Sequence, residues 1–277
     1  SVTPEERESI LAFINDKQQS FLNRATVIDN FNLNYTEAEL YALSAAMQDS
    51  ASLVRYKALR KFMDFPPQER HDIALNHIRD SSRMVRVAAA ELLSDMSKGG
   101  LLKDDRSALD SAMQEYETML YTNADFPLGR VQLGDYYMRT GRGQEAIGQY
   151  KLALLKDSLA LPAYTSLATN YSSLGRNEEA LATLDLLVEK EPGYGRAFYL
   201  RGLLHYEMGN EDAAIADLRS AIEIDPQDYR SHYNLATLHY QRKEFRDAEG
   251  VVLKGLKIYP ESPDARYLLA LIYREQG

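Results

Sequence analysis

The sequence predicts an all-α protein, a right-handed α-solenoid of stacked helical hairpins. Two internal periods predict this fold: similar residues recur every 34 positions in residues 127–277 and every 31 positions in residues 1–97. Periods of this length are typical of repeated helical hairpins, each of which packs mainly on its neighbours. Glycine and proline recur at the longer interval, where helices have to turn or end. We therefore expect an extended stack rather than a globule with one central core.

The first segment, residues 1–98, carries arginine and aspartate at the shorter interval. Arg24, Arg55 and Arg86 are each 31 residues apart, and Asp49 and Asp80 share that spacing. The apolar pattern, broken by proline and glycine pairs, predicts helices over 37–48, 52–62, 67–78 and 82–96. The segment resembles HEAT-like repeats. That resemblance implies that the aspartate ends an inter-helix turn and that the following arginine ties neighbouring repeats together.

Residues 99–126 are predicted to form a transition between the two periods. Gly99-Gly100 breaks the preceding helical pattern. Further on, Tyr116 lies 34 residues before Tyr150, so it already follows the longer period. We therefore expect residues 105–121 to be the second helix of a degenerate repeat in front of the main array.

Residues 127–277 are predicted to contain four full repeats and the first helix of a fifth. The first helix of each repeat carries a small residue and then an aromatic or histidine, as in Gly134 and Tyr137. The small residue faces an alanine of the second helix, so that the two backbones approach closely. The repeats begin at Pro127, Leu161, Gly195, Tyr229 and Pro263.

This second pattern resembles the tetratricopeptide repeat (TPR). Several positions depart from it. Tryptophan is absent from the large position of the first helix, Arg201 replaces a leucine, Lys243 replaces the glycine of the turn, and Gly255 replaces an apolar residue. We expect these departures to loosen individual interfaces without threatening the fold. The fifth first helix either caps the array or precedes further chain, and its uncovered face makes self-association possible.

The composition excludes several classes of function. The net charge of −9 without a basic stripe argues against nucleic acid and against an anionic membrane surface as partners. The chain has no cysteine, which excludes disulfides, thiolate catalysis and covalently attached c-type haem within it. No apolar run is long enough to enter a membrane as a spanning helix. Because the chain begins at Ser1 without methionine, we expect a processed or excised piece of a longer protein.

No catalytic residue, metal site or cofactor is predicted. The chain has no phosphate-binding glycine loop, nucleophile elbow or zinc-binding His-Glu-x-x-His helix. His205 and His239 stand where other repeats carry tyrosine, so we interpret them as aromatic substitutes. We expect a protein that is not an enzyme.

A ladder of tyrosines and arginines is the predicted binding site. TPR proteins usually hold their partners against the first helices, on the concave face. At the corresponding positions of this chain stand Arg196, Tyr199, Tyr206, Arg230, Tyr233, Tyr240 and Tyr267. Tyrosine and arginine dominate binding hot spots because they bury much area and keep a polar end. The alternative is that these tyrosines only pack against neighbouring helices.

The predicted function is a protein-interaction scaffold that binds a protein or peptide partner. HEAT-like repeats followed by TPRs also resemble the C-terminal region of bacterial multihaem cytochrome-type proteins. That resemblance implies an alternative role, a docking or self-association module of a larger redox protein. The absence of cysteine fits either side of a bacterial inner membrane, and we favour the periplasm over the cytoplasm.

Overall fold

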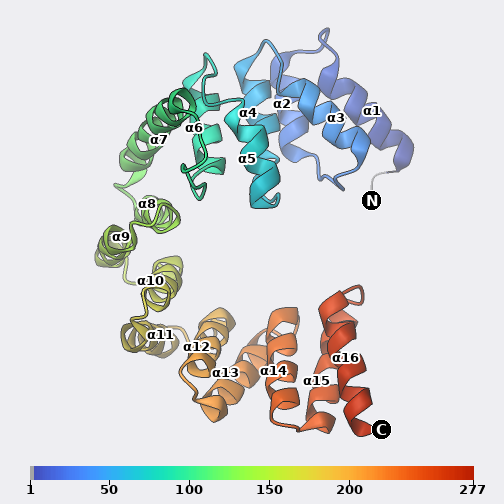
Figure 1. The fold of residues 1–277 in the computed structure, drawn as a ribbon, viewed down its shortest axis with the longest axis vertical. Coiled ribbons are helices and arrows are strands. Elements are labelled where there is room, and N and C mark those ends of the chain that lie inside the picture. The colour runs from blue at the N-terminus through green and yellow to red at the C-terminus, as the bar shows by residue number, and fades with distance from the viewer. Residues whose placement is uncertain (1–2) are drawn as a thin grey trace. The chain divides into compact units, whose positions relative to one another are not determined.

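The computed structural model describes residues 3–277, and every regular element in that range is an α-helix (Figure 1). Neighbouring helices pack on one another within each half of the chain, which confirms the predicted all-α solenoid class. The chain divides into two compact units, Ser1–Asn123 and Ala124–Gly277. The predicted division at residues 98 and 126 remains a prediction.

The N-terminal unit contains seven helices within its described residues. They are α1 (Pro4–Asn15), α2 (Phe21–Asn30), α3 (Glu37–Ala46), α4 (Ser52–Arg60), α5 (Pro67–Leu75), α6 (Arg83–Leu92) and α7 (Lys103–Asn123). The predicted helices 37–48, 52–62, 67–78 and 82–96 end earlier than expected. The apolar pattern continues past each end, but the backbone tightens there into turns joined over three residues, such as Phe62 N to Leu59 O at 3.1 Å.

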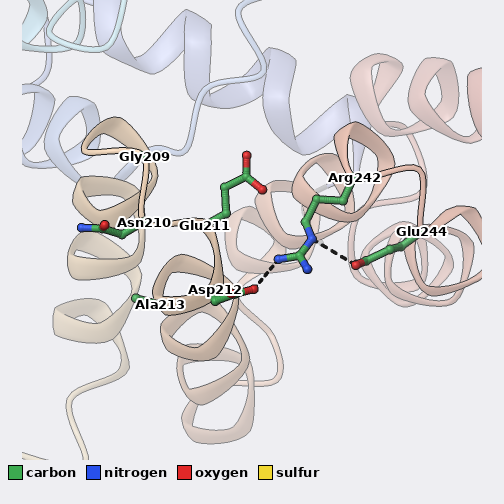
Figure 2. A pocket seen from close by; sticks show the side chains of 7 residues that line it. All are labelled: Gly209, Asn210, Glu211, Asp212, Ala213, Arg242 and Glu244. Atoms are coloured by element: carbon green, nitrogen blue, oxygen red, sulfur yellow. Dashed lines mark hydrogen bonds and ion pairs between the residues drawn. The ribbon is translucent and has the colours of Figure 1, made fainter.

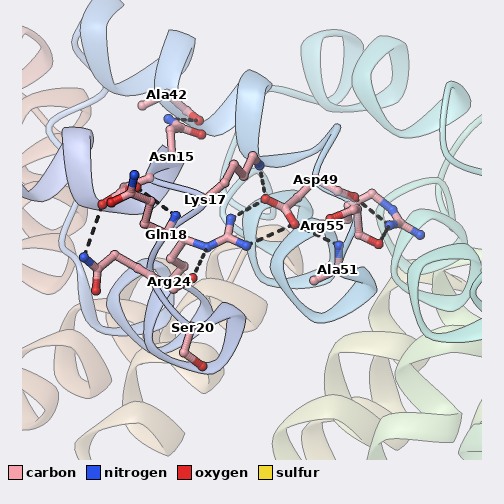
Figure 3. Close-up of polar contacts among 12 residues, drawn as sticks. Asn15, Lys17, Gln18, Ser20, Arg24, Ala42, Asp49, Ala51 and Arg55 are labelled. Carbon is pink, nitrogen blue, oxygen red and sulfur yellow. Dashed lines mark hydrogen bonds and ion pairs between the residues drawn. The ribbon is translucent and has the colours of Figure 1, made fainter.

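A ladder of charged pairs ties the N-terminal unit together (Figure 3). Arg24 of α2 donates both guanidinium ends to Asp49, and both side chains are buried. Arg55 of α4 donates through Nε and Nη2 to the two carboxylate oxygens of Asp80, at 2.8 and 2.6 Å. Arg55 also donates to the backbone oxygen of Asp49 at 2.7 Å, so the first rung is joined to the second. The contacts occur at the spacing seen in the sequence, while the HEAT-like assignment stays a prediction.

The C-terminal unit consists of helical hairpins that follow the 34-residue period (Figure 1). The first helices are α8 (Pro127–Arg139), α10 (Leu161–Ser173), α12 (Gly195–Glu207), α14 (Tyr229–Gln241) and α16 (Pro263–Gln276). The second helices are α9 (Gly143–Lys156), α11 (Asn177–Lys190), α13 (Glu211–Ile224) and α15 (Phe245–Ile258). Each second helix packs on the first helix of its own repeat and on the first helix of the next repeat.

The turns between paired helices need a left-handed residue. Gly141, Gly175 and Gly209 have φ of 77°, 72° and 80°, and Lys243 takes the same conformation with φ 62°. Glycine adopts this conformation without steric cost, whereas a lysine is strained there by its Cβ. The fourth repeat therefore keeps its turn geometry despite the substitution.

Arg201 does not loosen its interface, and on this point the sequence-based expectation was wrong. Its guanidinium binds both oxygens of Asp217 in α13, at 2.7 and 2.8 Å, and reaches Asp185 of α11 at 2.8 Å. The side chain of Asp217 is only 9% exposed. A planar guanidinium matches two carboxylate oxygens at once, so an ion pair fills the place that leucine occupies in other repeats.

Candidate peptide-binding face

The seven predicted site residues lie on α12, α14 and α16. We call the surface formed by positions 2, 5, 9 and 12 of these helices the first-helix face. Tyr206 and Tyr267 are 40% and 67% exposed, and Arg196 and Arg230 are also exposed. Tyr199, Tyr233 and Tyr240 are partly buried. The predicted site residues therefore differ in how much of each side chain is free for a partner.

Polar contacts join the first-helix face from one repeat to the next. The Tyr199 hydroxyl accepts a hydrogen bond from Asn234 of α14 at 3.2 Å. The Arg230 guanidinium lies 5.3 Å from the centroid of the Tyr199 ring, within the range of a cation–π contact. Its hydrogen bond to Asp228, at 3.1 Å, raises the pKa of Arg230, so the arginine remains cationic. These contacts hold the side chains of α12 and α14 in a fixed arrangement before any partner arrives.

Two of the tyrosines also pack against the hydrophobic core. Tyr233 stacks on Tyr229 with ring centroids 6.1 Å apart, and the ring centroid of Tyr240 lies 5.7 Å from that of Phe245. Both tyrosines contact the buried cluster around Ala236. The packing interpretation therefore applies at least in part to Tyr233 and Tyr240.

Arg196 is the unneutralised cation of this face. Among the described residues it has no ion pair or hydrogen bond, whereas Arg230 is bound to Asp228. The chain as a whole is acidic, with a net charge of −9. A free cation at the start of α12 favours a partner segment with negative charge next to this helix.

A cavity that was not expected from the sequence lies between α10 and α12, with a volume of about 160 Å³. Its lining combines apolar side chains with polar ones: Ala168, Thr169, Ser172, Leu184, Leu200, Leu203, Leu204 and Glu207. The signal for it in the sequence is the small Ser172, which stands where the next two repeats carry Tyr206 and Tyr240.

A more polar recess lies where the turns of the third and fourth repeats adjoin (Figure 2). Arg242 stands between two carboxylates, 2.5 Å from Asp212 and 3.0 Å from Glu244. Its charge is therefore already neutralised by the chain. We interpret this recess as a contact between repeats rather than as a ligand site.

One group of potential metal ligands exists among the described residues. Atoms of His239, Glu244 and Asp247 lie within 4.8 Å of one another. His239 Nδ1 and Glu244 are already joined at 2.5 Å, and Arg242 also binds Glu244. The position of His239 is held in the first repeat by Tyr137, on whose ring a guanidinium stacks 4.0 Å from the centroid. The pair of His239 and Glu244 thus replaces the tyrosine–arginine contact of the first repeat. The positive charge of Arg242 next to Glu244 disfavours a metal cation there.

Among the described residues, no helix combines the length and the apolar character needed to cross a membrane.

The geometry defines a helical-repeat protein whose first helices present a preorganised polar and aromatic face. Family models of the tetratricopeptide repeat match residues 165–229 and 205–272. Residues 165–272 of this chain therefore match the tetratricopeptide repeat, which confirms the repeat that the sequence pattern predicted.

Solved structures resemble the chain in fold. A TPR protein of Thermus thermophilus, TTC0263, has 23% identity and a TM-score of 0.50 and covers 61% of this chain and 92% of its own. MamA has 23% identity and a TM-score of 0.49, covering 55% of this chain and 82% of its own. The Yersinia enterocolitica chaperone SycD, solved with a peptide of the translocator YopD, has 22% identity and a TM-score of 0.40 over 42% of this chain and 95% of its own. No curated protein matches the chain.

Proposed function

We propose that the C-terminal unit is a non-enzymatic scaffold that binds a protein or peptide on the first-helix face of α12, α14 and α16. The observation that carries the proposal is that Tyr206 and Tyr267 are exposed and that Arg196, at the start of α12, is exposed and unneutralised. Exposed tyrosines give a partner much area to bury at little cost in side-chain entropy. A preorganised face further reduces the cost of binding, and stacked repeats typically use such extended surfaces for recognition.

Variants of the exposed residues test peptide binding without disturbing the fold. Tyr233 and Tyr240 are less suitable because they also pack against the hydrophobic core. We would replace Arg196, Tyr206 and Tyr267 together, as Arg196→Ala/Tyr206→Ser/Tyr267→Ser. The matched control is Tyr273→Ser, since Tyr273 is 47% exposed on α16 but lies off this face. Peptides selected from a phage-displayed random library on the wild-type protein serve as the probe.

We expect the triple variant to bind the selected peptides roughly 30-fold more weakly, which corresponds to the loss of one hot spot of about 2 kcal/mol. The Tyr273→Ser control should bind as the wild type does, and circular dichroism should show both variants folded. Unchanged affinity in the triple variant would mean that the first-helix face is not the binding surface.

A second candidate function is self-association through α16. Ala236 is fully buried at its repeat position, whereas Ala270, at the same position of α16, is exposed. Likewise Tyr273 is 47% exposed while its equivalent Tyr171 is 4% exposed. We expect a second copy to cover this face, and Ala270→Arg to convert a dimer to a monomer in analytical ultracentrifugation. A wild-type protein that is monomeric throughout the accessible concentration range would exclude this role.

The docking role within a larger redox protein remains a prediction. Cys-x-x-Cys-His motifs upstream of Ser1 in the parent gene would support it, and a parent gene that encodes only repeats would argue for the scaffold.

A further inference from the structure

A small side chain, Ser172, lines the cavity between α10 and α12. Ser172 is the twelfth residue of its repeat, and it contacts the next repeat through a 3.2 Å hydrogen bond from its hydroxyl to Glu207. Most of the apolar lining of the cavity comes from four leucines, Leu184, Leu200, Leu203 and Leu204. The hydroxyl of Ser172 reaches Glu207, but its short side chain leaves the space over the leucines unfilled.

The next repeat carries a larger side chain at the equivalent position. Tyr206 is the twelfth residue of its own repeat, and its hydroxyl donates to Gln241 of α14 at 2.9 Å. Gln241 corresponds to Glu207, because both are the thirteenth residue of a repeat. The two junctions therefore make the same hydrogen bond between first helices, one through a tyrosine and the other through a serine. The junction at Tyr206 contains an aromatic ring that the junction at Ser172 lacks.

We propose that this cavity is the anchor site for a tyrosine side chain of the bound peptide, which takes the place that Tyr206 holds at the next junction. The inference rests on the proposed function, in which the first-helix face receives a peptide. The phenol ring would lie over Leu203 and Leu204, and its hydroxyl would donate to Glu207 in place of the Ser172 hydroxyl.

The size and chemistry of the cavity fit this occupant. A cavity of about 150 Å³ lined by aliphatic and aromatic groups accepts a benzene molecule in other proteins, and this one has about 160 Å³. A phenol offers an apolar body to the leucines and one donor to a carboxylate, which is a strong acceptor. Phenylalanine would fill the same space but leave Glu207 without that donor.

The positive charge of Arg196 on α12 indicates which residue of the peptide lies next to the anchoring tyrosine. Arg196 lies seven residues before Leu203, which is about 10 Å along the axis of α12. Because Arg196 is unneutralised, an acidic residue close to the anchoring tyrosine would complete the contact. The partner is thus a peptide with a tyrosine and a nearby aspartate or glutamate.

The first test uses the side chain alone as the probe. 4-Methylphenol is the tyrosine side chain as a free molecule, and toluene is that of phenylalanine. We expect 4-methylphenol to cause saturable NMR shifts at residues lining the cavity, with an affinity about tenfold higher than that of toluene because of the Glu207 hydrogen bond. Glu207→Ala should abolish this preference while both probes still bind.

The decisive variant is Ser172→Tyr, which fills the cavity from within the chain. It reproduces the tyrosine of the next repeat, so we expect it to fold with unchanged helicity and to lose all saturable shifts. Ser173→Tyr is the matched control, because Ser173 is the exposed neighbour on the same helix and does not line the cavity. Absence of saturable shifts in the wild type, or equal binding by Ser172→Tyr, would overturn the inference.

Library peptides separate this inference from the proposed function. If selected peptides contain tyrosine and lose at least about tenfold in affinity for Ser172→Tyr, a loss of about 1.4 kcal/mol, the anchor site is supported. If they depend on Tyr206, Tyr267 and Arg196 but bind Ser172→Tyr normally, the face binds peptides and the anchor is wrong. If they depend on Ser172 alone, the anchor stands and the rest of the proposed face does not.

Discussion

Replacing Gly134 with alanine should destabilise the first TPR even though alanine is the better helix former. An added Cβ at this position of α8 would lie 2.5 Å from Cε1 of Tyr150 in α9. The Tyr150 ring is fully buried, and its hydroxyl donates to Asp135 at 2.8 Å. Burial also raises the pKa of Tyr150, so its hydroxyl stays protonated as a donor. The ring therefore has no open space into which it can retreat.

Three terms set the magnitude. Overpacking of a filled core costs about 1–3 kcal/mol. A displaced ring also weakens the hydrogen bond to the Asp135 carboxylate, a bond of a kind that contributes about 1.5–3 kcal/mol. The higher helix propensity of alanine offsets about 1 kcal/mol of this loss of stability. We expect Gly134→Ala to lower the free energy of opening of this repeat by about 2–4 kcal/mol.

The assay is hydrogen exchange of α8 and α9 amides, because a stack of repeats need not unfold in a single two-state transition. Gly148→Ala is the matched control. Gly148 lies within α9, and no atom stands within 4 Å of an added Cβ. This control should gain up to about 1 kcal/mol from helix propensity.

The second repeat suggests a rescue. At the positions equivalent to Gly134 and Tyr150 it carries Ala168 and Leu184. The double variant Gly134→Ala/Tyr150→Leu should therefore be at least about 1 kcal/mol more stable than the sum of its single variants predicts. Two results would contradict this reasoning. One is that Gly134→Ala leaves the α8 and α9 amides as well protected from exchange as Gly148→Ala does. The other is that the effects of Gly134→Ala and Tyr150→Leu on stability simply add, in which case contact with Tyr150 is not the reason for glycine at position 134.

Three further predictions follow from the charged and exposed residues. Arg201→Leu removes the guanidinium from the buried Asp217, whose remaining ion-pair neighbour is His205 at 3.9 Å. We expect a cost of about 3–5 kcal/mol in urea unfolding, and Arg201→Leu/Asp217→Val should recover most of it. Burial alone would raise the pKa of Asp49, but hydrogen bonds from Arg24 and Lys17 outweigh it and hold that pKa well below its usual range. The resulting stability is present above the unfolded pKa of about 3.9 and is lost as pH falls through the folded pKa, so Asp49→Asn should flatten the acid dependence of exchange in α2 and α4. Tyr267→Ser should change stability by less than about 0.5 kcal/mol because the ring is 67% exposed.

Each of these predictions has an outcome that contradicts it. A double variant at Arg201 and Asp217 no more stable than Arg201→Leu would mean that the carboxylate left without its guanidinium is not the cause of the loss. Equal acid sensitivity with and without Asp49 would assign the pH dependence to other carboxylates. Clear destabilisation by Tyr267→Ser would show that this ring supports the fold.

The sequence alone determined the class of fold and the periodic surface. Helix formation, the glycine turns and the proline ends depend on local residue types, and the 34-residue period carries them along the chain. The same period predicts that Tyr199 and Tyr233 take equivalent places on neighbouring first helices, because equivalent residues of stacked hairpins occupy equivalent positions. The match of residues 165–272 to the tetratricopeptide repeat followed from the same pattern.

The tertiary structure decided which of these residues are available to a partner. Tyr206 and Tyr233 look alike in the sequence, yet Tyr206 is 40% exposed while Tyr233 packs on a buried cluster. Arg201 found its carboxylate partners in two other helices. The cavity beside Ser172 needed the side chains of three helices to define its walls. Burial, ion pairing and empty volume depend on the atoms that neighbouring repeats bring together, and the residues of one helix do not specify them.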